Sequence, residues 1–426
     1  MSATAQLAGG SLPRLLAGID PNGRQAAGPV EHERVYGPMP QLSPGRLIEE
    51  VRQAGLRGRG GADFPTARKL FAVAERRNAG AVVVNGSETE PASQKDRLLM
   101  AALPHLVLDG AVAAAQAVKA QEVIVKLGPD SRSAIRALER AIGERSDGVP
   151  IQLVEGPGGY VTGEESAVVH YLNGGAALPT FVPPRPYERG YRGRPTLIQN
   201  PETLAQLALI SRYGARWFRE LGTSADPGTV LATISGAVAS PGVYELAFGT
   251  PLRDLVDAAG GPTEPIQAFL IGGYFGTWTT WRASGELELA REGLAAAGQA
   301  LGSGVLIALG ESACALHESA ALTRYLARES AGQCGPCVHG LAAMADTFSA
   351  LVDGVAHRAE RERLLRWAVE LPGRGACHHP NGAARFVRSS LQTFGNQLEQ
   401  HARSGCRAGA TGLPGVETPT VRRVRR

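Results

Sequence analysis

The chain has 426 residues, which at about 100–200 residues per domain predicts two to four domains rather than one. Hydrophobic residues make up 43% and charged residues 20%, a composition typical of a globular protein and unlike that of a disordered chain. The formal net charge is +4, and four arginines at the C-terminal end account for it. A broad basic face for nucleic acid is therefore not expected.

The sequence carries no signal that predicts export or membrane insertion. Its N-terminal residues lack a basic segment followed by a long apolar run. The most apolar stretch, 106–118, is too short to cross a bilayer and contains Asp109. We expect a cytoplasmic protein without a direct membrane span, peripheral to a membrane only through a partner.

The first two thirds of the chain alternate between helical and extended patterns. Residues 1–40 are rich in Gly, Pro and Ala, and we expect a loose arm. A helix from about residue 44, a glycine-rich turn and a helix opening at Pro65 follow. Apolar β-branched runs then alternate with helical stretches, with strands at 81–86, 122–128 and 150–156 and helices at 103–120 and 131–145. This alternation predicts crossover connections and a parallel sheet, and thus an α/β domain over 41–227.

The pattern changes near residue 228. Apolar and polar residues then alternate between Gly and Pro turns, which predicts a small β-rich domain over 228–300. The segment 301–405 is almost wholly helical in pattern from Glu318 onward. We expect 406–426 to be a basic flexible tail.

The glycine-rich turn over 55–61 leads into a helix and is flanked by Arg57, Arg59 and Lys69. Backbone amides at a helix N-terminus attract phosphate, so the turn predicts a phosphate site. It is not the dinucleotide fingerprint, because Asp63 stands where the third glycine would be and a helix precedes the turn. A purely structural turn is the alternative.

Polar residues cluster after two of the expected strands. Asn85, Glu88 and Glu90 follow the first strand, and Glu164 and Glu165 follow the third. Ligands bind at this carboxyl edge of open α/β sheets. The first group could hydrogen-bond a heteroaromatic ring and its hydroxyls, and the second could orient an electron donor such as nicotinamide. Solvated turn and capping residues are the alternatives.

Five cysteines are too few and too unevenly placed for a disulfide framework. Cys314 and Cys406 are expected to be ordinary thiols. The other three form a cluster in the sequence that suits an iron–sulfur cluster or zinc. Both need four ligands, so we expect one nearby histidine to join Cys334, Cys337 and Cys377, the candidates being His339, His378 and His379.

Five motifs occur in an order that resembles a known family. They read GLRGRGGADFPTARKL, VVVNGSETEPASQKDR, GGYVTGEESAVV, GRPTLIQNPETLA and ESAGQCGPC. Over about residues 45–400 the chain resembles the flavin-bearing, NADH-oxidising subunit of respiratory complex I and its relatives in soluble hydrogenases and formate dehydrogenases. The resemblance implies a Rossmann-like α/β flavin domain, a β-grasp-like SLBB domain and a helical iron–sulfur domain over the three ranges given above.

The resemblance also implies the residues of an FMN site. Those at the phosphate and ribityl chain would be Gly58, Arg59, Gly60, Gly61 and Lys69. The rest of the flavin would be held by Asn85, Glu88, Gly163, Glu164 and Asn200, with Phe64 as a remaining aromatic of the site. Glu90 and Glu165 match catalytic carboxylates at the nicotinamide side. Cys334, Cys337 and Cys377 match three of four ligands of a [4Fe-4S] cluster, with His378 and His379 beside them.

The chain departs from the family pattern at several positions. Ala331 stands where the first cluster cysteine is expected, so the cluster would be [3Fe-4S], ligated by histidine or water, or absent. Val182, Arg185 and Ala72 replace residues expected near the nucleotide. Arg185 could stack on adenine or bind a 2′-phosphate, which would favour NADPH.

The implied function is that of a flavin and iron–sulfur oxidoreductase subunit. Electrons would pass from NAD(P)H through FMN to the cluster and on to a ferredoxin-like or other iron–sulfur subunit, or to a membrane oxidoreductase. One alternative is a non-catalytic electron-relay or docking subunit that binds FMN but not NADH. Another is a structural module in which zinc is held by Cys334, Cys337, Cys377 and a histidine.

Overall fold

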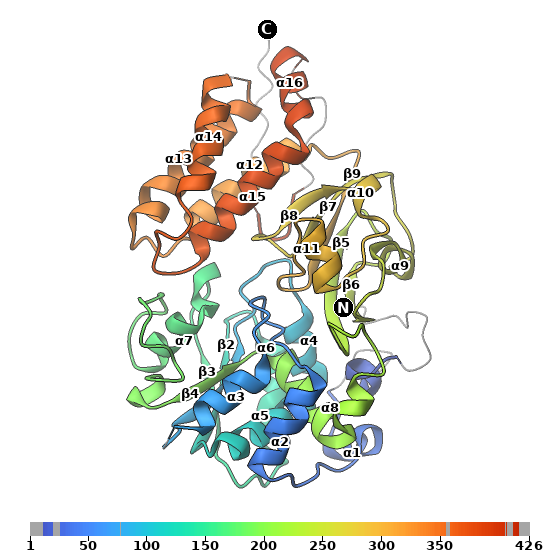
Figure 1. Ribbon diagram of the computed structural model, residues 1–426, viewed down its shortest axis with the longest axis vertical. Coiled ribbons are helices and arrows are strands. Elements are labelled where there is room, and N and C mark those ends of the chain that lie inside the picture. Colours follow the sequence, from blue (N-terminus) through green and yellow to red (C-terminus); the bar gives the residue numbers. More distant parts are fainter. Residues whose placement is uncertain are drawn as a thin grey trace.

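The computed structural model describes residues 12–19, 26–76, 78–354, 358–404, 406 and 412–416. Figure 1 shows three parts along the long axis: an α/β part at one end, a second sheet beside it, and a group of helices at the other end. The expectations for residues 1–11, 20–25, 407–411 and 417–426, which include the basic tail, lie outside the described residues.

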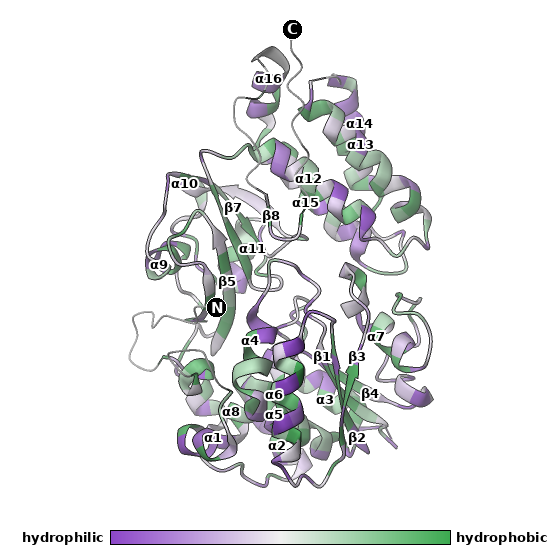
Figure 2. Cartoon of the chain, turned by 180° about the vertical axis from the view of Figure 1, so that it is seen from behind, coloured by the Kyte–Doolittle hydropathy of each residue, from purple (hydrophilic) through white to green (hydrophobic). Residues whose placement is uncertain are grey.

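The α/β part is built on a four-stranded parallel sheet, as the sequence predicts. Its strands are β1 (Ala81–Gly86), β2 (Glu122–Leu127), β3 (Ile151–Glu155) and β4 (Thr196–Gln199), in the order β3-β2-β1-β4. Val83 of β1 lies opposite Ile124 of β2 and Ile198 of β4. Strands β1, β2 and β4 are largely buried under the helices that cover the sheet, whereas the edge strand β3 is partly exposed, and Figure 2 shows the apolar residues of the sheet in green.

Seven helices surround this sheet in the described chain. They are α2 (Pro44–Ala54), α3 (Thr66–Ala74), α4 (Lys95–Ala102), α5 (Pro104–Val118), α6 (Arg132–Gly143), α7 (Glu165–Leu172) and α8 (Pro201–Phe218). Helix α5 is buried along almost its whole length and packs on α8. Gly110 permits this approach, because a Cβ there would lie 1.9 Å from the carbonyl oxygen of Leu204.

Within the described residues, no single helix is long and apolar enough to span a membrane. Helices α4 and α5, which are bent by 97° relative to each other, together have the length and apolar composition of a span.

The second sheet has five strands in mixed orientation. They are β5 (Thr229–Gly236), β6 (Gly242–Ala247), β7 (Ile266–Ile271), β8 (Thr277–Thr280) and β9 (Val305–Gly310), in the order β6-β5-β9-β7-β8. The short helices α9 (Leu252–Ala258), α10 (Trp281–Ser284) and α11 (Arg291–Ala296) accompany it. The expected boundary at residue 300 is too early, because β9 is the central strand of this sheet. Its run VLIALG could not be told from a buried helical segment by periodicity.

The last part is helical, as expected. It contains α12 (Ala315–Arg328), a π-helical turn (Pro336–Leu341), α13 (Ala342–Val352), α14 (Arg358–Glu370), α15 (His379–Thr393) and α16 (Gly395–Ser404). Helix α15 docks on strand β8, where the Trp278 amide donates to Ser389 Oγ at 3.2 Å.

Two described segments near the ends of the chain are more regular than the sequence predicts. Residues of the expected loose arm form a 3-10 turn (Leu15–Gly18) and α1 (Pro29–Tyr36). The buried carboxylate of Glu245 in β6 accepts hydrogen bonds from the amides of Arg14 (2.9 Å), Leu15 (2.9 Å) and Leu16 (3.1 Å). A buried carboxylate needs such donors, so this segment is held against the second sheet. Within the expected tail, Leu413 and Val416 are buried.

Candidate functional site

A large cavity lies where the carboxyl ends of β1 and β4 meet the other two parts of the chain. Its volume of about 1640 Å³ exceeds the roughly 300–1,000 Å³ of common small-molecule pockets and leaves room for two adjoining ligands. The lining includes most of the residues expected at the FMN and nicotinamide sites: Gly58, Gly60, Gly61, Phe64, Lys69, Asn85, Glu90, Gly163, Glu164, Glu165 and Asn200. Cys377, His378 and His379 line the same cavity.

The glycine-rich turn presents bare backbone to this cavity. The Gly58 amide donates to the Phe64 carbonyl at 2.8 Å, and Arg57 Nε donates to Asp63 Oδ2 at 2.7 Å. Gly61 has φ of +97°, a conformation that L side chains rarely adopt. Gly60 packs closely on α8, since a Cβ there would lie 3.4 Å from the Cβ of Asn200. These contacts hold the turn in place, and its backbone amides lead into α3.

Arg59 does not line the cavity, contrary to the expectation that it contacts the cofactor. Its amide donates to Thr203 Oγ1 at 2.9 Å, and its buried guanidinium donates to the Thr229 carbonyl at 3.2 Å and lies 3.9 Å from Glu202. The ring of Phe248 lies 4.6 Å from the same guanidinium. Arg59 therefore ties the turn to the second sheet.

Lys69 and Glu165 form an ion pair across the cavity wall. Lys69 comes from α3, and Glu165 is the first residue of α7. The preceding Glu164 is the N-cap of α7, and its carboxylate accepts from the amides of Ser166 (2.8 Å) and Ala167 (3.2 Å). A cation and two carboxylates thus lie along one side of the cavity.

Two asparagines of the site are held by their neighbours. Asn85 donates to the Gly163 carbonyl at 2.7 Å, which joins the tip of β1 to the segment before α7. Asn200 caps α8 by accepting from the Glu202 amide at 2.9 Å, and it donates to Asp96 at 2.6 Å. Both side chains line the cavity in fixed orientations.

Glu88 is a structural residue in this fold and does not line the cavity. Its carboxylate accepts from the amides of Asp96 and Arg97, each at 2.9 Å, and from Ser93 Oγ at 2.7 Å. Arg97 Nε also donates to it at 3.0 Å. The carboxylate therefore stabilises the first turn of α4 and does not face the cavity where the flavin contact is expected.

Glu90 is buried in the cavity wall. Its Oε2 accepts from the Tyr160 hydroxyl at 2.7 Å and from the Tyr274 amide at 3.1 Å. Burial raises the pKa of Glu90 to about 7, and these hydrogen bonds offset part of that effect. Its carboxyl group can therefore hold or release a proton near neutral pH.

A buried lysine lies behind the tip of β1. Lys126 of β2 donates to Ser87 Oγ at 2.8 Å and to the Thr162 carbonyl at 3.4 Å. Burial lowers the pKa of Lys126 to about 8. Ser87 also donates to Asn85 Oδ1 at 2.8 Å, so the lysine supports a residue of the cavity through one hydroxyl.

The structure brings Cys334, Cys337 and Cys377 together. Cys337 is buried in the π-helical turn, and the other two are half-buried. The pKa of Cys337 is raised by burial and by the neighbouring thiols of Cys334 and Cys377. Within the described chain the three sulfur atoms are not among the ligand atoms that lie within 4.8 Å of one another. Neighbouring thiols of this kind are ligands that both zinc and iron–sulfur clusters use.

Two of the three histidines expected to complete this ligand set, His378 and His379, have other partners. His379 is buried, and its Nε2 donates to the Leu326 carbonyl at 2.7 Å. His378 Nδ1 lies 3.3 Å from Nδ2 of the Asn381 side chain. Neither joins the three thiols in a compact group of ligand atoms within the described residues. The zinc module suggested for these thiols therefore stays a prediction.

The aromatic residues of the cavity differ from those expected. Phe64 lines it with Arg68 5.6 Å from its ring, and Phe71 and Ala72 line it as well. Two contributors were not predicted from the sequence: Phe275, from the loop before β8, and Ser303, from the loop before β9. Their loops read only as turns in the sequence, and it is the docking of the second sheet that brings them to the cavity.

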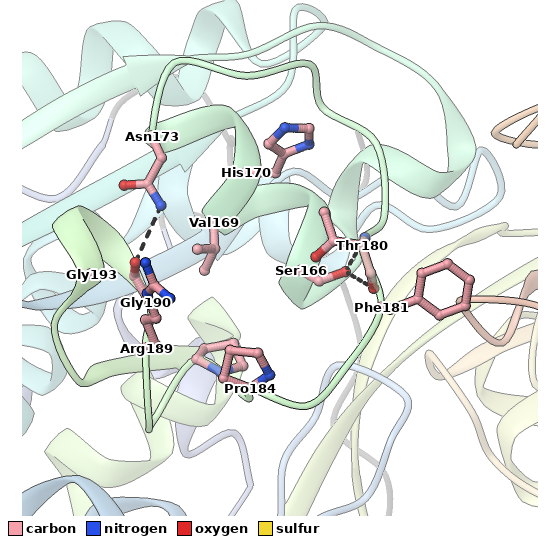
Figure 3. A pocket seen from close by; sticks show the side chains of 11 residues that line it. Ser166, Val169, His170, Asn173, Thr180, Phe181, Pro184, Arg189, Gly190 and Gly193 are labelled. Carbon is pink, nitrogen blue, oxygen red and sulfur yellow. Dashed lines mark hydrogen bonds between the residues drawn. The ribbon is translucent and has the colours of Figure 1, made fainter.

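A second cavity of about 590 Å³ lies behind α7 (Figure 3). The connection after α7 encloses it, with Thr180 and Phe181 on one side and Gly190 on the other. The Thr180 amide donates to Ser166 Oγ at 2.9 Å, which holds the connection against α7.

The cavity and the thiols fit the cofactors that the sequence implies. Glu90 Oε1, Gln199 Nε2 and Ser303 Oγ are buried without hydrogen-bond partners within the described residues, and all three residues line the large cavity. Unpaired buried polar atoms are costly, so a polar ligand would satisfy them. The three thiols are suitable ligands for iron.

Comparison with known proteins gives consistent matches along the chain. Residues 51–209 match the family model of the Nuo51 FMN-binding domain, 231–271 that of the SLBB domain, and 317–401 that of the NADH-ubiquinone oxidoreductase-F iron-sulfur binding region. An NADH-quinone oxidoreductase subunit of Escherichia coli (strain K12) is 34% identical over 377 residues, covering 84% of each chain. The protein of the same name in Mycobacterium tuberculosis (strain H37Rv) is 33% identical over 390 residues, covering 85% of this chain and 86% of its own.

A solved structure shares the fold. A chain of the NAD+-reducing [NiFe]-hydrogenase in the H2-reduced state superposes with a TM-score of 0.77 at 33% identity. The match covers 84% of this chain and 62% of the hydrogenase chain. The three-part architecture is therefore shared over most of this chain.

Proposed function

The chain belongs to the family of NADH-quinone oxidoreductase subunits that contain the Nuo51 FMN-binding domain, and on this basis we propose that it is an electron-transfer oxidoreductase subunit with FMN and an iron–sulfur cluster. NAD(P)H is its electron donor, and an iron–sulfur protein is its acceptor. The observation that carries the proposal is the shared cavity, since the glycine-rich turn and Cys377 both line it. One cavity can thus bring a flavin to the edge of the cluster site.

FMN, when bound, supplies hydride acceptance and the release of single electrons. The amides of the glycine-rich turn and the Lys69 ammonium would bind its phosphate in this proposal, because the turn leads into the helix that carries Lys69 and both line the cavity. Asn85 and Asn200 orient the ribityl chain and ring through side chains that are already fixed. Glu165 keeps Lys69 in place until phosphate displaces it.

Glu90 and Tyr160 act at the nicotinamide side of the cavity. The Glu90 carboxyl group holds a proton near neutral pH, and the Tyr160 hydroxyl fixes its Oε2. Oε1 is left for the substrate. Glu90 therefore positions the nicotinamide carboxamide, which offers both a hydrogen-bond donor and an acceptor.

Cys334, Cys337 and Cys377 bind the cluster, with a non-cysteine fourth position because of Ala331. Of the three thiols, Cys377 is the one that lines the cavity in the described chain, which favours it as the ligand nearest the flavin. Partners of the ferredoxin-like or other iron–sulfur class, or a membrane oxidoreductase, and a cytoplasmic location peripheral to a membrane remain part of the proposal.

The test is an anaerobic titration of the purified protein with NADH and with NADPH while flavin absorbance is followed. We expect bleaching by at least one of the two nucleotides, together with flavin, iron and sulfide in the protein. A protein that contains no flavin and does not bind added FMN would refute the proposal.

A non-catalytic relay that binds FMN but not NAD(P)H is the second candidate. Ala72 favours it, because this small side chain lines the cavity where the resemblance calls for a ring that stacks on the nucleotide. Loss of one stacking contact weakens binding by roughly 0.5–1.5 kcal/mol. Reduction of the flavin by a reduced ferredoxin but by neither pyridine nucleotide would establish this candidate over the first.

A further inference from the structure

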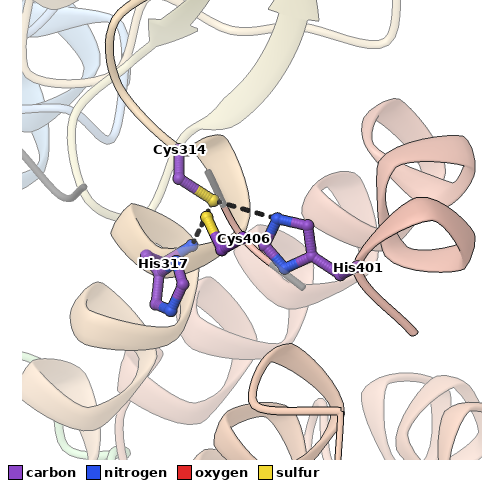
Figure 4. Close-up of side chains that lie close together, drawn as sticks. All are labelled: Cys314, His317, His401 and Cys406. Atoms are coloured by element: carbon purple, nitrogen blue, oxygen red, sulfur yellow. Dashed lines mark hydrogen bonds between the residues drawn. The ribbon is translucent and has the colours of Figure 1, made fainter. Parts of the chain in front are cut away.

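Two cysteines and two histidines meet at a point that the proposed function does not use. Cys314 caps α12 and His317 lies in its first turn, while His401 lies in α16 and Cys406 follows that helix. One potential ligand atom of each lies within 4.8 Å of the others, as Figure 4 shows. Among the described residues, these four side chains form the group of histidine, cysteine or acidic residues whose ligand atoms lie close enough together to share one metal ion.

The contacts within the group are close. Cys314 Sγ lies 3.4 Å from His401 Nε2, and the His317 amide donates to Cys314 Sγ at 3.5 Å. The two imidazole rings are 5.7 Å apart between centroids. His401 Nδ1 faces the Val352 carbonyl at 3.4 Å, a contact that leaves the lone pair of Nε2 directed at the group. Metal-bound histidines are commonly oriented in this way.

We propose that Cys314, His317, His401 and Cys406 form a structural zinc site. Two thiolates and two neutral imidazoles are a common ligand set for tetrahedral zinc, and the two thiolate charges neutralise the ion. The pairs follow the short spacings Cys-x2-His at the start of α12 and His-x4-Cys at the end of α16. A disulfide between the cysteines would explain their approach but not the two imidazoles beside them, and the buried Nδ1 of His317 has no hydrogen-bond partner within the described residues.

This site is separate from the proposed iron–sulfur site. Cys314 lies at the N-terminal end of α12, whereas Cys334 follows its C-terminal end. A helix of 14 residues is about 21 Å long. The two metal sites therefore lie at opposite ends of α12 and can be removed independently.

The zinc would anchor a C-terminal strap, which we define as residues 412–416. The Gly412 amide donates to Glu318 Oε1 at 2.9 Å, and the Tyr274 hydroxyl donates to the Pro414 carbonyl. The backbone amide of Tyr274 in turn donates to Glu90. By joining α12 to Cys406, the ion would fix the chain six positions before Gly412, close in sequence to the strap that supports the cavity wall from behind.

The experiment is metal analysis of the full-length protein, purified anaerobically, for zinc and iron together. We expect one zinc per chain. His401→Gln and Cys314→Ser should lose the zinc but keep iron, and Cys334→Ser should show the reverse. His105→Gln is the matched control, because His105 is buried in α5 and pairs with Glu144 outside this group. Limited proteolysis should cut the strap of His401→Gln faster than that of the control.

A second measurement is independent of variant folding. Replacement of zinc by Co2+ in the wild-type chain should give the visible bands of a tetrahedral thiolate site, which added zinc abolishes. Protein without zinc and without these bands would overturn the proposal. So would a Cys314–Cys406 disulfide found by peptide mapping after thiol alkylation under anaerobic conditions.

Discussion

The Tyr160 hydroxyl donates a hydrogen bond of 2.7 Å to Oε2 of Glu90, and this bond joins two segments that are 70 residues apart in sequence. The Tyr160 amide also donates to Glu329 Oε2 at 2.9 Å. Glu329 lies two positions before Ala331, in the segment that leads to the thiols. Tyr160 therefore connects the carboxylate side of the cavity to the segment of the proposed cluster site. A displacement of either segment would change the hydrogen bonds that Tyr160 makes to the other.

The buried Glu90 carboxyl group predicts a pH-dependent stability. Its pKa is about 7 in the folded protein against 4.5 as its ordinary value, so the folded state binds its proton more tightly than the unfolded state. Its contribution is thus fully present below pH 4.5 and is lost as pH rises through about 7. The loss amounts to about 3 kcal/mol at most. Urea unfolding of flavin-free wild type and Glu90→Gln between these limits measures it as a difference.

We expect wild type to lose stability relative to Glu90→Gln as pH rises, because the amide does not titrate. Glu311→Gln is the control, since Glu311 is exposed and its change should leave the pH dependence of wild type intact. A constant difference between wild type and Glu90→Gln across the range would contradict the prediction.

Lys69→Met should weaken FMN binding. A charged hydrogen bond to phosphate contributes about 1.5–3 kcal/mol, so the Kd should rise roughly tenfold to a hundredfold. Fluorescence titration of flavin-free protein measures it. Arg76→Met is the control. Arg76 lies just beyond the same helix, pairs with Glu188 at 3.5 Å and does not line the cavity. The Kd of this variant for FMN should therefore stay near that of wild type. Equal effects of the two changes would show that general charge, and not the position of Lys69, attracts the cofactor.

Much of the fold could be predicted because local patterns decide it. The runs at 81–86 and 122–128 are apolar and β-branched, and both are strands in the buried sheet. Strand β4 was not predicted from the sequence, because Thr196–Gln199 is short and follows an irregular connection rich in Pro and Arg. Its place beside β1 comes from tertiary pairing, which periodicity does not report.

The candidate site was predictable in its residue types but not in the direction of each side chain. Glu88 and Glu90 are both acidic residues after β1, yet one caps α4 and the other is buried in the cavity wall. The difference depends on where α4 begins and on the docking of the Tyr274 loop. Cys314 and Cys406 were read as unrelated thiols, because 91 intervening residues separate them and only the packing of α16 on the bundle brings them together.

Arg59→Met should destabilise the fold rather than the cofactor site itself. The guanidinium is buried between Glu202, the Thr229 carbonyl and the Phe248 ring, so its loss removes a charged hydrogen bond, an ion pair and a cation–π contact from the interior. We expect the free energy of unfolding to fall by about 2–3 kcal/mol. Urea unfolding measures it, with Arg57→Met as the control. Arg57 is more exposed and pairs with Asp63, so its loss should cost less than about 1 kcal/mol. A fully stable Arg59→Met that no longer binds FMN would restore the direct role expected from the sequence.

Ala331→Cys should complete the ligand set of the cluster. Ala331 lies three residues before Cys334, the same spacing that separates Cys334 from Cys337, and the Tyr160 amide holds the nearby Glu329 in place. A fourth thiolate would bind the iron that three cysteines leave to water or another weak ligand. We expect more iron per chain and slower bleaching of the cluster in air. Anaerobic iron and sulfide analysis, with EPR of the reduced protein, measures both.

Ala331→Ser is the matched control, because a hydroxyl is a poor ligand for iron in such a cluster, and it should behave as wild type. If Ala331→Cys changed neither the iron content nor the EPR signal, the fourth position would already be filled by another protein group.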